Sequence, residues 1–502
     1  MNFEFSPNSP ERISADAVII LAFETENKPF LSKEGKLLDQ RLKNLISTEI
    51  KNEDYKAKAK ELLAITSSAK VMARKIFVVG LGKRGCLARD QFRSLFADFI
   101  KKTKGKLSSV AISLLESSET DISQKNQCAL IAEGAILGNY KFMKYKSEDE
   151  KQKQLENIIF LKITDKAKDK LKSAIEKTKI FCKATMLARD LVNEPSSVVN
   201  PTFLANLALE IAKKSKNIKC TAYNREQIKK MGMGAFLGIA QAADTEPKFI
   251  HLEYTPDKST GKNKIALVGK GITFDTGGVS LKQSDYMTDM KCDMAGAAAV
   301  IGVFSVISEL KPKISVMGVI AATPNMISGK STVPGDVVRA LNGKTIEILN
   351  TDAEGRVTLA DSLSYAVKKG ATHIIDLATL TGAAHVSLGD NIAALFGNNI
   401  NLKEKIEKAA LRTDEKIWNM PLEKTYKELN KSEIADIANL ASDRYGGAIT
   451  GALFLEEFVD KKPWAHLDIA GVAFAGKEYD LGPKGGTGFG VRMLLDFLLD
   501  QN

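Results

Sequence analysis

Cysteine and histidine are scarce in this chain of 502 residues. No two of the five cysteines form a CxxC pair, which is typical of free thiols in a reducing compartment rather than of a disulfide framework. The four histidines form neither an HExxH motif nor a close pair, so a histidine-based zinc peptidase is not expected. The chain also lacks a GxSxG motif, which leaves a serine nucleophile without support.

Long hydrophobic runs are missing as well. The longest apolar stretch, residues 294–307, is too short and too rich in Gly and Ala to be expected to span a membrane. The first twenty residues lack a basic segment followed by an apolar one, so no signal peptide is expected. Because 44% of the residues are hydrophobic and 26% charged, the composition is that of an ordinary soluble protein. We therefore expect a cytoplasmic location and no membrane partner.

The basic excess is confined to one part of the chain. The formal net charge is +11, and residues 1–190 hold 36 basic and 25 acidic residues, so residues 191–502 are balanced. A basic excess can indicate contact with nucleic acid. Runs such as "KKTKGK" (101–106) and "KAKDKLK" (166–172) are more often solvated faces, so DNA is expected only as an alternative partner.

The first part of the chain alternates between strand and helix patterns. Apolar runs at 17–23, 75–82, 110–115 and 158–163 predict strands, and the periodicity of 89–102 and 126–142 predicts helices. We expect a smaller α/β domain over residues 1–165, followed by a connecting helix over 166–193.

The second part repeats the alternation. Strands are predicted at 264–269, 314–322, 345–349 and 373–378, all apolar throughout, as is typical of parallel strands covered on both faces. An amphipathic helix is predicted over 356–370 and ends at Gly370. We expect residues 194–502 to form a larger α/β catalytic domain with a mainly parallel central sheet.

A glycine motif in the first domain, "GLGKRG" (80–85), fits the GxGxxG pattern of dinucleotide sites. It follows a predicted strand and precedes a predicted helix. The acidic residue expected about 20 positions later has no good candidate, because Asp98 lies within the predicted helix. We therefore interpret the motif as an ordinary turn.

Charged side chains gather in three segments of the second domain, near predicted strand ends. They are Lys270, Asp275 and Lys282 in "VGKGITFDTGGVSLK", Asp293 in "MTDMKCDMAG", and Asp352, Glu354 and Arg356 in "NTDAEGR". Ligands of parallel α/β sheets bind outside the carboxyl ends of the strands. Carboxylates converging there repel one another unless cations are present, and hard divalent metals take oxygen ligands. The segments therefore predict a metal site.

Together these segments resemble those of the leucyl aminopeptidase family, the two-metal cytosol aminopeptidases that include bacterial aminopeptidase A. "NTDAEGR" is similar to the family's signature, and "VGKGITFDTGG", "MKCDMAGAAAV", "PGDVV" and "DLATLTGA" also match in order and spacing. The resemblance extends over the whole chain. It is very specific across 265–385 and looser before residue 190.

This resemblance implies a metal-dependent aminopeptidase with two divalent ions per subunit, zinc or manganese. One metal would be held by Lys270, Asp275, Asp293 and Glu354, and the other by Asp275, Asp352 and Glu354. A lysine ligand must lose a proton that it normally keeps until pH ~10.4. A neighbouring dication disfavours the ammonium form and makes this coordination feasible.

The resemblance also implies two catalytic residues. A metal pair generates a nucleophile from water near neutral pH, and Lys282 would stabilise the charge that develops on the scissile carbonyl oxygen. Arg356 would hold a bicarbonate ion that shuttles the proton, a task that suits a guanidinium fork. Binding of the substrate's free α-amine to a metal would confine cleavage to the N-terminus.

Substrate choice and assembly follow from the same resemblance. Met290 and the stretch from Thr379 to Gly382 match positions that line the pocket for the first side chain. A pocket lined by Met favours apolar side chains, Leu among them. The resemblance further implies peptide substrates and a homohexamer of two stacked trimers.

Two other functions are weighed against this one. A DNA-binding accessory protein would use the basic N-terminal domain, with or without peptidase activity, as some bacterial relatives do. A two-metal phosphoesterase would share the carboxylates, but it gives no reason for a site that takes a free amine.

Overall fold

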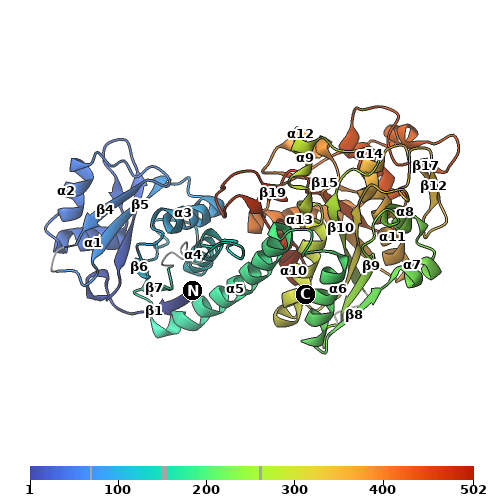
Figure 1. Cartoon of the computed structure of the whole chain (residues 1–502). Coiled ribbons are helices and arrows are strands. Elements are labelled where there is room, and N and C mark those ends of the chain that lie inside the picture. Colours follow the sequence, from blue (N-terminus) through green and yellow to red (C-terminus); the bar gives the residue numbers. More distant parts are fainter. Residues whose placement is uncertain (68–69, 148–154, 259–262, 502) are drawn as a thin grey trace. The chain divides into compact units, whose positions relative to one another are not determined.

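The computed structural model describes all residues except 68–69, 148–154, 259–262 and 502. The chain divides into two compact units (Figure 1). The N-terminal unit contains Met1–Cys182 and Glu478–Pro483, and the C-terminal unit contains Lys183–Lys477 and Lys484–Asn502. Helix α5 (Asp165–Asn193) begins in the first unit and ends in the second. The expected fold class is confirmed: a smaller α/β domain precedes a long helix and a larger α/β domain.

The N-terminal unit is built on a seven-stranded sheet in the order β1-β7-β6-β2-β5-β4, with β3 paired to β2. Its strands are β1 (Asn2–Phe5), β2 (Ala17–Glu24), β3 (Phe30–Leu31), β4 (Leu62–Thr66), β5 (Lys75–Lys83), β6 (Ser109–Ser113) and β7 (Asn157–Leu161). Its helices before α5 are α1 (Lys33–Arg41), α2 (Leu45–Asn52), α3 (Arg89–Lys102) and α4 (Gln124–Gly138). The strands and helices predicted in this region are confirmed.

Alternating residues of this sheet fill two separate cores. Ile19 of β2 packs with Phe92 of α3 and Ile131 of α4, whereas its neighbour Ile20 packs with Leu38 of α1 and Ile46 of α2. This is the period of two expected when helices cover both faces of a sheet.

The glycine motif at 80–85 has a packing role in this unit. A Cβ on Gly80 would lie 2.1 Å from the carbonyl oxygen of Lys58. The glycine therefore allows the chain at residues 57–58 to approach β5. Because β5 runs to Lys83, Gly80 and Gly82 lie in the strand, and the expectation of a turn across the whole motif is wrong.

The C-terminal unit is built on an eight-stranded sheet in the order β16-β15-β18-β14-β10-β11-β9-β8. Its strands are β8 (Ile218–Tyr223), β9 (Lys248–Tyr254), β10 (Lys264–Asp275), β11 (Ser315–Asn325), β14 (His373–Ala378), β15 (Ala393–Gly397), β16 (Ile417–Asn419) and β18 (Trp464–Asp468). The four central strands β18, β14, β10 and β11 are parallel, and antiparallel pairs occur only toward the edges.

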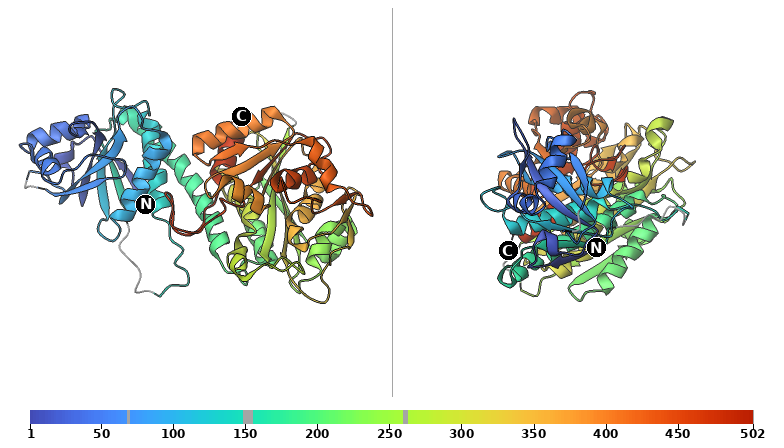
Figure 2. Two further views of the ribbon diagram at one scale, coloured as in Figure 1. Left: turned by 90° about the horizontal axis from the view of Figure 1, so that it is seen from above. Right: turned by 90° about the vertical axis from the view of Figure 1, so that its left-hand side faces the viewer.

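Helices α10 (Ala295–Leu310) and α11 (Glu354–Lys368) cover opposite faces of this sheet (Figure 1; Figure 2). Val268 of β10 packs into the core that contains residues of α11. The next residue, Gly269, faces α10, because its Cβ would lie 2.6 Å from the carbonyl oxygen of Gly296. The stretch 284–310 is, among the described residues, long and apolar enough to cross a membrane, but 78% of its most apolar window is buried. Its helix α10 is therefore a core helix of this unit.

The remaining elements surround the sheet. The other helices are α6 (Pro201–Lys213), α7 (Arg225–Met231), α8 (Gly234–Ala240), α9 (Ser284–Met287), α12 (Gly382–Leu388), α13 (Ile400–Thr413), α14 (Gly447–Glu456) and α15 (Val491–Leu499). Short strands β12 (Val337–Arg339), β13 (Thr345–Glu347) and β17 (Ile437–Ala438) form a three-stranded sheet, and β19 (Phe474–Ala475) pairs with β20 (Gly485–Gly486).

Two sequence predictions need correction. The strand predicted at 264–269 continues to Asp275, so Lys270 lies within β10 rather than after it. The run 345–349 forms β13 of the three-stranded sheet and not a strand of the large one. The prediction assumed a strand covered on both faces. In the small sheet the partner strand β12 is largely exposed, so this sheet is not covered on both faces.

Candidate metal and catalytic site

Polar side chains gather at the carboxyl ends of the parallel strands. Asp275 ends β10, Asn325 ends β11, Asp468 ends β18, and Thr379 directly follows β14. Strands that run in parallel bring these ends to one edge of the sheet, where α/β proteins bind ligands. Asp275 therefore lies at the carboxyl end of a parallel strand, as the sequence predicts.

The other carboxylates come from helix starts rather than strand ends. Asp293 lies two residues before α10, and Glu354 is the first residue of α11. Asp352 lies in the short 3-10 turn Thr351–Ala353 just before α11. Carboxylates are favoured there by the exposed N–H groups and the dipole of a helix. The expectation that all three segments lie near strand ends is therefore wrong for Asp293, whereas Asp352 and Glu354 follow β13 of the small sheet.

Close packing brings α10 up to the sheet. A Cβ on Gly296 would lie 2.0 Å from the carbonyl oxygen of Leu377 in β14. Only a glycine permits this approach, which places the start of α10, and with it Asp293, beside β10.

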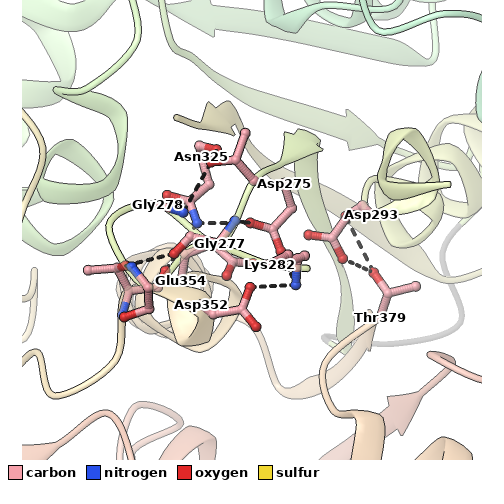
Figure 3. A network of polar contacts seen from close by, with 12 residues as sticks. Asp275, Gly277, Gly278, Lys282, Asp293, Asn325, Asp352, Glu354 and Thr379 are labelled. Carbon is pink, nitrogen blue, oxygen red and sulfur yellow. Dashed lines mark hydrogen bonds and ion pairs between the residues drawn. The ribbon is translucent and has the colours of Figure 1, made fainter. Parts of the chain in front are cut away.

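Three of the carboxylates converge on one point. Asp275, Asp293 and Glu354 each offer an oxygen, and these oxygens lie within 4.8 Å of one another. All three side chains are buried. Figure 3 shows that Asp275, Asp293 and Asp352 point toward the same space as Lys282.

The ammonium of Lys270 lies in this cluster. Its Nζ is 2.8 Å from Oδ1 of Asp293 and 2.9 Å from Oε1 of Glu354, and it donates to the carbonyl oxygen of Thr379 at 2.9 Å. Burial alone would lower the pKa of Lys270, but the carboxylates of Asp293, Glu354 and Asp275 raise it above its ordinary value. The structure thus brings together the residues predicted around the first metal.

Lys282 connects the remaining carboxylate to the cluster. Its Nζ lies 2.9 Å from Oδ2 of Asp275 and also pairs with Asp352. The chain turns back at Gly277 and Gly278, whose φ angles are +85° and +65°, and this turn carries Lys282 over the site.

Two carboxylate oxygens are left without hydrogen bonds. Oδ2 of Asp293 and Oε2 of Glu354 are buried and have no hydrogen-bond partner among the described residues, while Oε1 of Glu354 is paired with the ammonium of Lys270. Burial raises the pKa of Asp293 to about 6 against the opposing effect of Lys270, and it raises that of Glu354 well above its ordinary value. Buried acceptors without donors are costly. Divalent cations bound by oxygen ligands would satisfy these atoms, so the residues fit the expected metals.

Neighbouring side chains fix the orientation of the carboxylates. Asn325 donates to Oδ1 of Asp275 at 2.8 Å, and the backbone N–H of Gly277 donates to the same oxygen at 2.9 Å. The hydroxyl of Thr379 donates to Oδ1 of Asp293 at 2.7 Å. Hydrogen bonds of this kind hold metal ligands in place.

Arg356 lies in the first turn of α11 and is buried. Its Nη1 donates to the carbonyl oxygen of Asn439 at 3.0 Å, while its Nε has no hydrogen-bond partner among the described residues. Burial lowers the pKa of this guanidinium. A cation at a helix N-terminus is unfavourable, and the free N–H is available to an anion.

The predicted pocket residues lie near the cluster along the chain. Met290 is half-buried in the short turn Met290–Cys292 that precedes Asp293, and Gly382 is exposed at the start of α12. Thr379 contacts both Asp293 and Lys270. The contacts therefore connect Thr379 to the site directly.

Three residues of the site were missed in the sequence. Asn325 and Asp468 each end a parallel strand, so the rule that located Asp275 applies to both. The strand predicted at 314–322 stopped short of Asn325, and β18, which ends at Asp468, was not predicted. Asn439 follows β17, and no local pattern distinguishes it.

Comparisons with known proteins match the whole chain. The catalytic-domain profile of the cytosol aminopeptidase family matches residues 186–495, and the family's N-terminal-domain profile matches residues 19–149. A relative from Alkaliphilus oremlandii, with the name "Probable cytosol aminopeptidase", is 40% identical over 495 residues. The match covers 98% of this chain and 98% of that protein. A relative of the same name from Thermosynechococcus vestitus is 42% identical, with 99% of each chain covered.

Solved structures agree with these matches. A mutant of tomato leucine aminopeptidase has a TM-score of 0.89 and 35% identity, with 100% of this chain and 96% of that chain covered. The bottromycin maturation enzyme BotP in complex with Mn has a TM-score of 0.83 and 31% identity, with 97% of this chain and 100% of that chain covered.

Proposed function

Because this chain belongs to the cytosol aminopeptidase family and is a metallo-aminopeptidase, we propose that it releases N-terminal Leu and other apolar residues from peptides with two divalent metals. The observation that carries this proposal is the convergence of Asp275, Asp293 and Glu354, with two buried oxygens, Oδ2 of Asp293 and Oε2 of Glu354, that no described donor reaches.

We assign the metal ligands as the resemblance implies. Lys270, Asp275, Asp293 and Glu354 would hold one ion, and Asp275, Asp352 and Glu354 the other. The contacts of Lys270 with Asp293 and Glu354 support the first set, and the position of Lys282 between Asp275 and Asp352 supports the second. Zinc and manganese both suit such sites, and the Mn named for BotP favours manganese as the first ion to test.

The ions, when bound, supply Lewis acidity that activates water near neutral pH and polarises the scissile carbonyl. The chain adds charge at fixed positions. Lys282 is held near the cluster by Asp275 and Asp352, where its ammonium can stabilise a developing oxyanion. Arg356 offers a buried guanidinium with an unpartnered Nε, which suits the bidentate binding of bicarbonate. We propose that this anion takes part in proton transfer.

Specificity for the first side chain is assigned to Met290, Thr379 and Gly382. Gly382 is open, since a Cβ there would meet no atom within 4 Å, and this leaves room for a substrate side chain. The flexible, apolar Met290 would favour Leu over charged residues. Replacement of Met290 by Lys should therefore shift preference away from leucyl substrates.

Assembly into a homohexamer and a cytoplasmic location complete this proposal, on the basis of the resemblance. A shared assembly would enclose the sites and admit only short or unfolded peptides. Sedimentation that shows a stable monomer at working concentration would exclude the hexamer.

DNA binding by the N-terminal unit is a second proposal, favoured by the basic excess of residues 1–190. Many lysines there are paired with carboxylates, such as Lys33 with Glu116 and Lys162 with Glu34, which reduces the charge available to phosphates. Binding to duplex DNA should weaken steeply as salt rises. Affinity that does not depend on salt would contradict a phosphate-contact mode.

The test of the main proposal is hydrolysis of a leucyl chromogenic amide beside its N-acetylated analogue. Both are assayed after chelation and again after manganese or zinc is restored. Metal-dependent cleavage of the free-amine substrate alone is the expected result. Cleavage of neither substrate under any metal would refute the aminopeptidase assignment, and cleavage of both would refute the requirement for a free amine.

A further inference from the structure

Asn439 joins two parts of the site that lie on different segments. It follows β17 and is fully buried, with 0% of its surface exposed. Its side chain contacts the turn that leads to Asp352 and Glu354, and its backbone contacts Arg356. None of the roles assigned so far to ligands, catalytic residues or pocket residues includes it.

The side chain of Asn439 acts like one more peptide group of the small sheet. Its Oδ1 accepts from the backbone N–H of Leu349 at 2.8 Å and of Asn350 at 3.3 Å, and its Nδ2 donates to the carbonyl oxygen of Asn350 at 2.7 Å. The backbone N–H of Asn439 also donates to the carbonyl oxygen of Glu347 at 2.9 Å. The carboxamide therefore extends the pairing of β13 with β17 beyond the last strand residues.

These bonds determine where the metal-binding turn begins. Asn350, which Asn439 holds at both its N–H and its carbonyl, caps the turn by accepting from the backbone N–H of Asp352 at 2.8 Å. Two residues later Glu354 opens α11. A shift of Asn350 would therefore move both carboxylates relative to Asp275.

The backbone of the same residue orients Arg356. The carbonyl oxygen of Asn439 accepts from Nη1 of Arg356 at 3.0 Å. The Nε of Arg356 is buried and has no hydrogen-bond partner among the described residues, so it is available to an anion. Because Arg356 lies two residues after Glu354, Asn439 fixes both ends of the segment 350–356.

We propose that Asn439 is a positioning residue that sets the register of the segment 350–356, so that Asp352 and Glu354 meet the metals while the Nε of Arg356 stays available to the bicarbonate ion. The proposal rests on the function proposed above. Only a carboxamide of this length can accept two N–H groups and donate to a carbonyl at the same place. The substitution Asn439→Asp would keep an acceptor for the two N–H groups. It would also place a buried negative charge next to the carbonyl oxygen of Asn350.

The test compares Asn439→Asp and Asn439→Ser with the matched control Asn398→Asp. Asn398 also bridges two backbone groups, accepting from the N–H of Trp464 at 2.9 Å and donating to the carbonyl of Lys462 at 3.0 Å. Asn398 is exposed, directly follows β15 and bonds to the first residue of β18, at the opposite end of that strand from Asp468. Asn398 therefore tests the loss of a bridging carboxamide away from the site.

Three quantities are measured for each variant: Mn²⁺ affinity by calorimetry, kcat and KM on a leucyl amide, and the melting temperature. For the Asn439 variants we expect Mn²⁺ affinity to fall about tenfold and kcat about ten- to a hundredfold, as is typical when a residue behind the metal ligands is changed. KM should change less, and the Asn398 variant should keep the Mn²⁺ affinity and kcat of the wild type.

Mn²⁺ affinity and kcat within twofold of the wild type in folded Asn439→Asp would overturn the proposal, whatever happens to the melting temperature. If that variant does not fold, Asn439→Ser supports the same comparison, because its shorter side chain introduces no charge. Failure of the wild type to cleave the leucyl amide would refute the proposed function alone. The effect of Asn439 on Mn²⁺ affinity would still test the positioning role.

Discussion

Gly355 and Lys270 lie in such close contact that no side chain fits between them. A Cβ on Gly355 would be 2.5 Å from Cε and 2.7 Å from Nζ of Lys270. Gly355 therefore gives Lys270 the space to reach Asp293 and Glu354. This contact explains why a glycine stands between Glu354 and Arg356 at the start of α11, although glycine is a poor helix former.

Replacement of Gly355 by Ala should weaken metal binding while it leaves the fold intact. The new methyl group displaces the end of Lys270, which is flexible, so the backbone of α11 can stay in place. We expect Mn²⁺ affinity and kcat to fall about ten- to a hundredfold. Calorimetry and a leucyl amide assay measure the two effects.

The control is Gly329→Ala, because a Cβ on Gly329 would meet no atom within 4 Å. This variant should match the wild type in both assays. Normal metal affinity in Gly355→Ala would show that Lys270 does not bind metal or that it can reach the site by another path.

Removal of the metals should lower the melting temperature. Asp275, Asp293 and Glu354 are buried within 4.8 Å of one another, and bound cations relieve their repulsion. An ion present at 100 times its Kd stabilises the folded state by about 2.7 kcal/mol for each site. Thermal melts before and after chelation, and after metal is returned, measure this shift.

The variant Asp352→Asn should bind one ion tightly instead of two, because Asp352 belongs to only one of the proposed ligand sets. Asp336→Asn is the control, since Asp336 is a half-buried acceptor for the N–H of Val333 outside the carboxylate cluster. Metal analysis after dialysis distinguishes the outcomes. Two retained ions in Asp352→Asn would contradict the assignment of this residue.

The location of the site could be predicted from the sequence because parallel strands end at one edge of a sheet. Asp275 follows from this rule, and apolar runs revealed the central strands β10, β11 and β14. The rule does not reach Asp293 or Glu354, whose positions depend on where helices α10 and α11 begin. Their roles could be inferred only from resemblance to a family.

Other features depend on contacts between distant segments. The bonds of Asn439 with Leu349 and Arg356 join residues more than 80 positions apart, and no local period encodes them. The short strands β15 and β16 also depend on pairing with segments distant in the sequence. In the glycine motif at 80–85, the close approach of Lys58 to Gly80 is likewise a contact between separate segments.

Asp361 should make stability depend on pH. This carboxylate of α11 is fully buried and accepts from the N–H groups of Phe236 at 2.8 Å and Leu341 at 2.7 Å. Burial outweighs these bonds and raises the pKa of Asp361 to about 7. The folded state then binds more protons than the unfolded state, whose Asp has a pKa of about 3.9. The contribution of Asp361 to stability is therefore greatest below about pH 4 and is lost as the pH rises toward 7.

The variant Asp361→Asn removes this titration. It should be destabilised at low pH by about 1–3 kcal/mol, since Asn offers one acceptor for two N–H groups. The difference from the wild type should shrink as the pH rises from about 5 to 8, because only the wild type loses stability there. Melting temperatures measured across this range test the sign, and a difference that grows with pH would contradict it.

Asp468 should influence the site through the turn that follows β14. Its Oδ1 accepts from the N–H of Leu380 at 3.1 Å, and its Oδ2 accepts from the hydroxyl of Thr381 at 2.6 Å. This turn presents Thr379 to Asp293 and Lys270. Asp468→Ala should therefore reduce kcat about tenfold and raise KM for leucyl substrates, because both the ligand contacts and the proposed pocket move.

Asp436→Ala is the matched control: Asp436 accepts from the N–H and hydroxyl of Thr345 at 2.7 and 2.8 Å in an exposed turn. If Asp468→Ala lowered only the melting temperature and left the kcat of the folded enzyme equal to that of the control, the carboxylate would stabilise the fold without positioning Thr379.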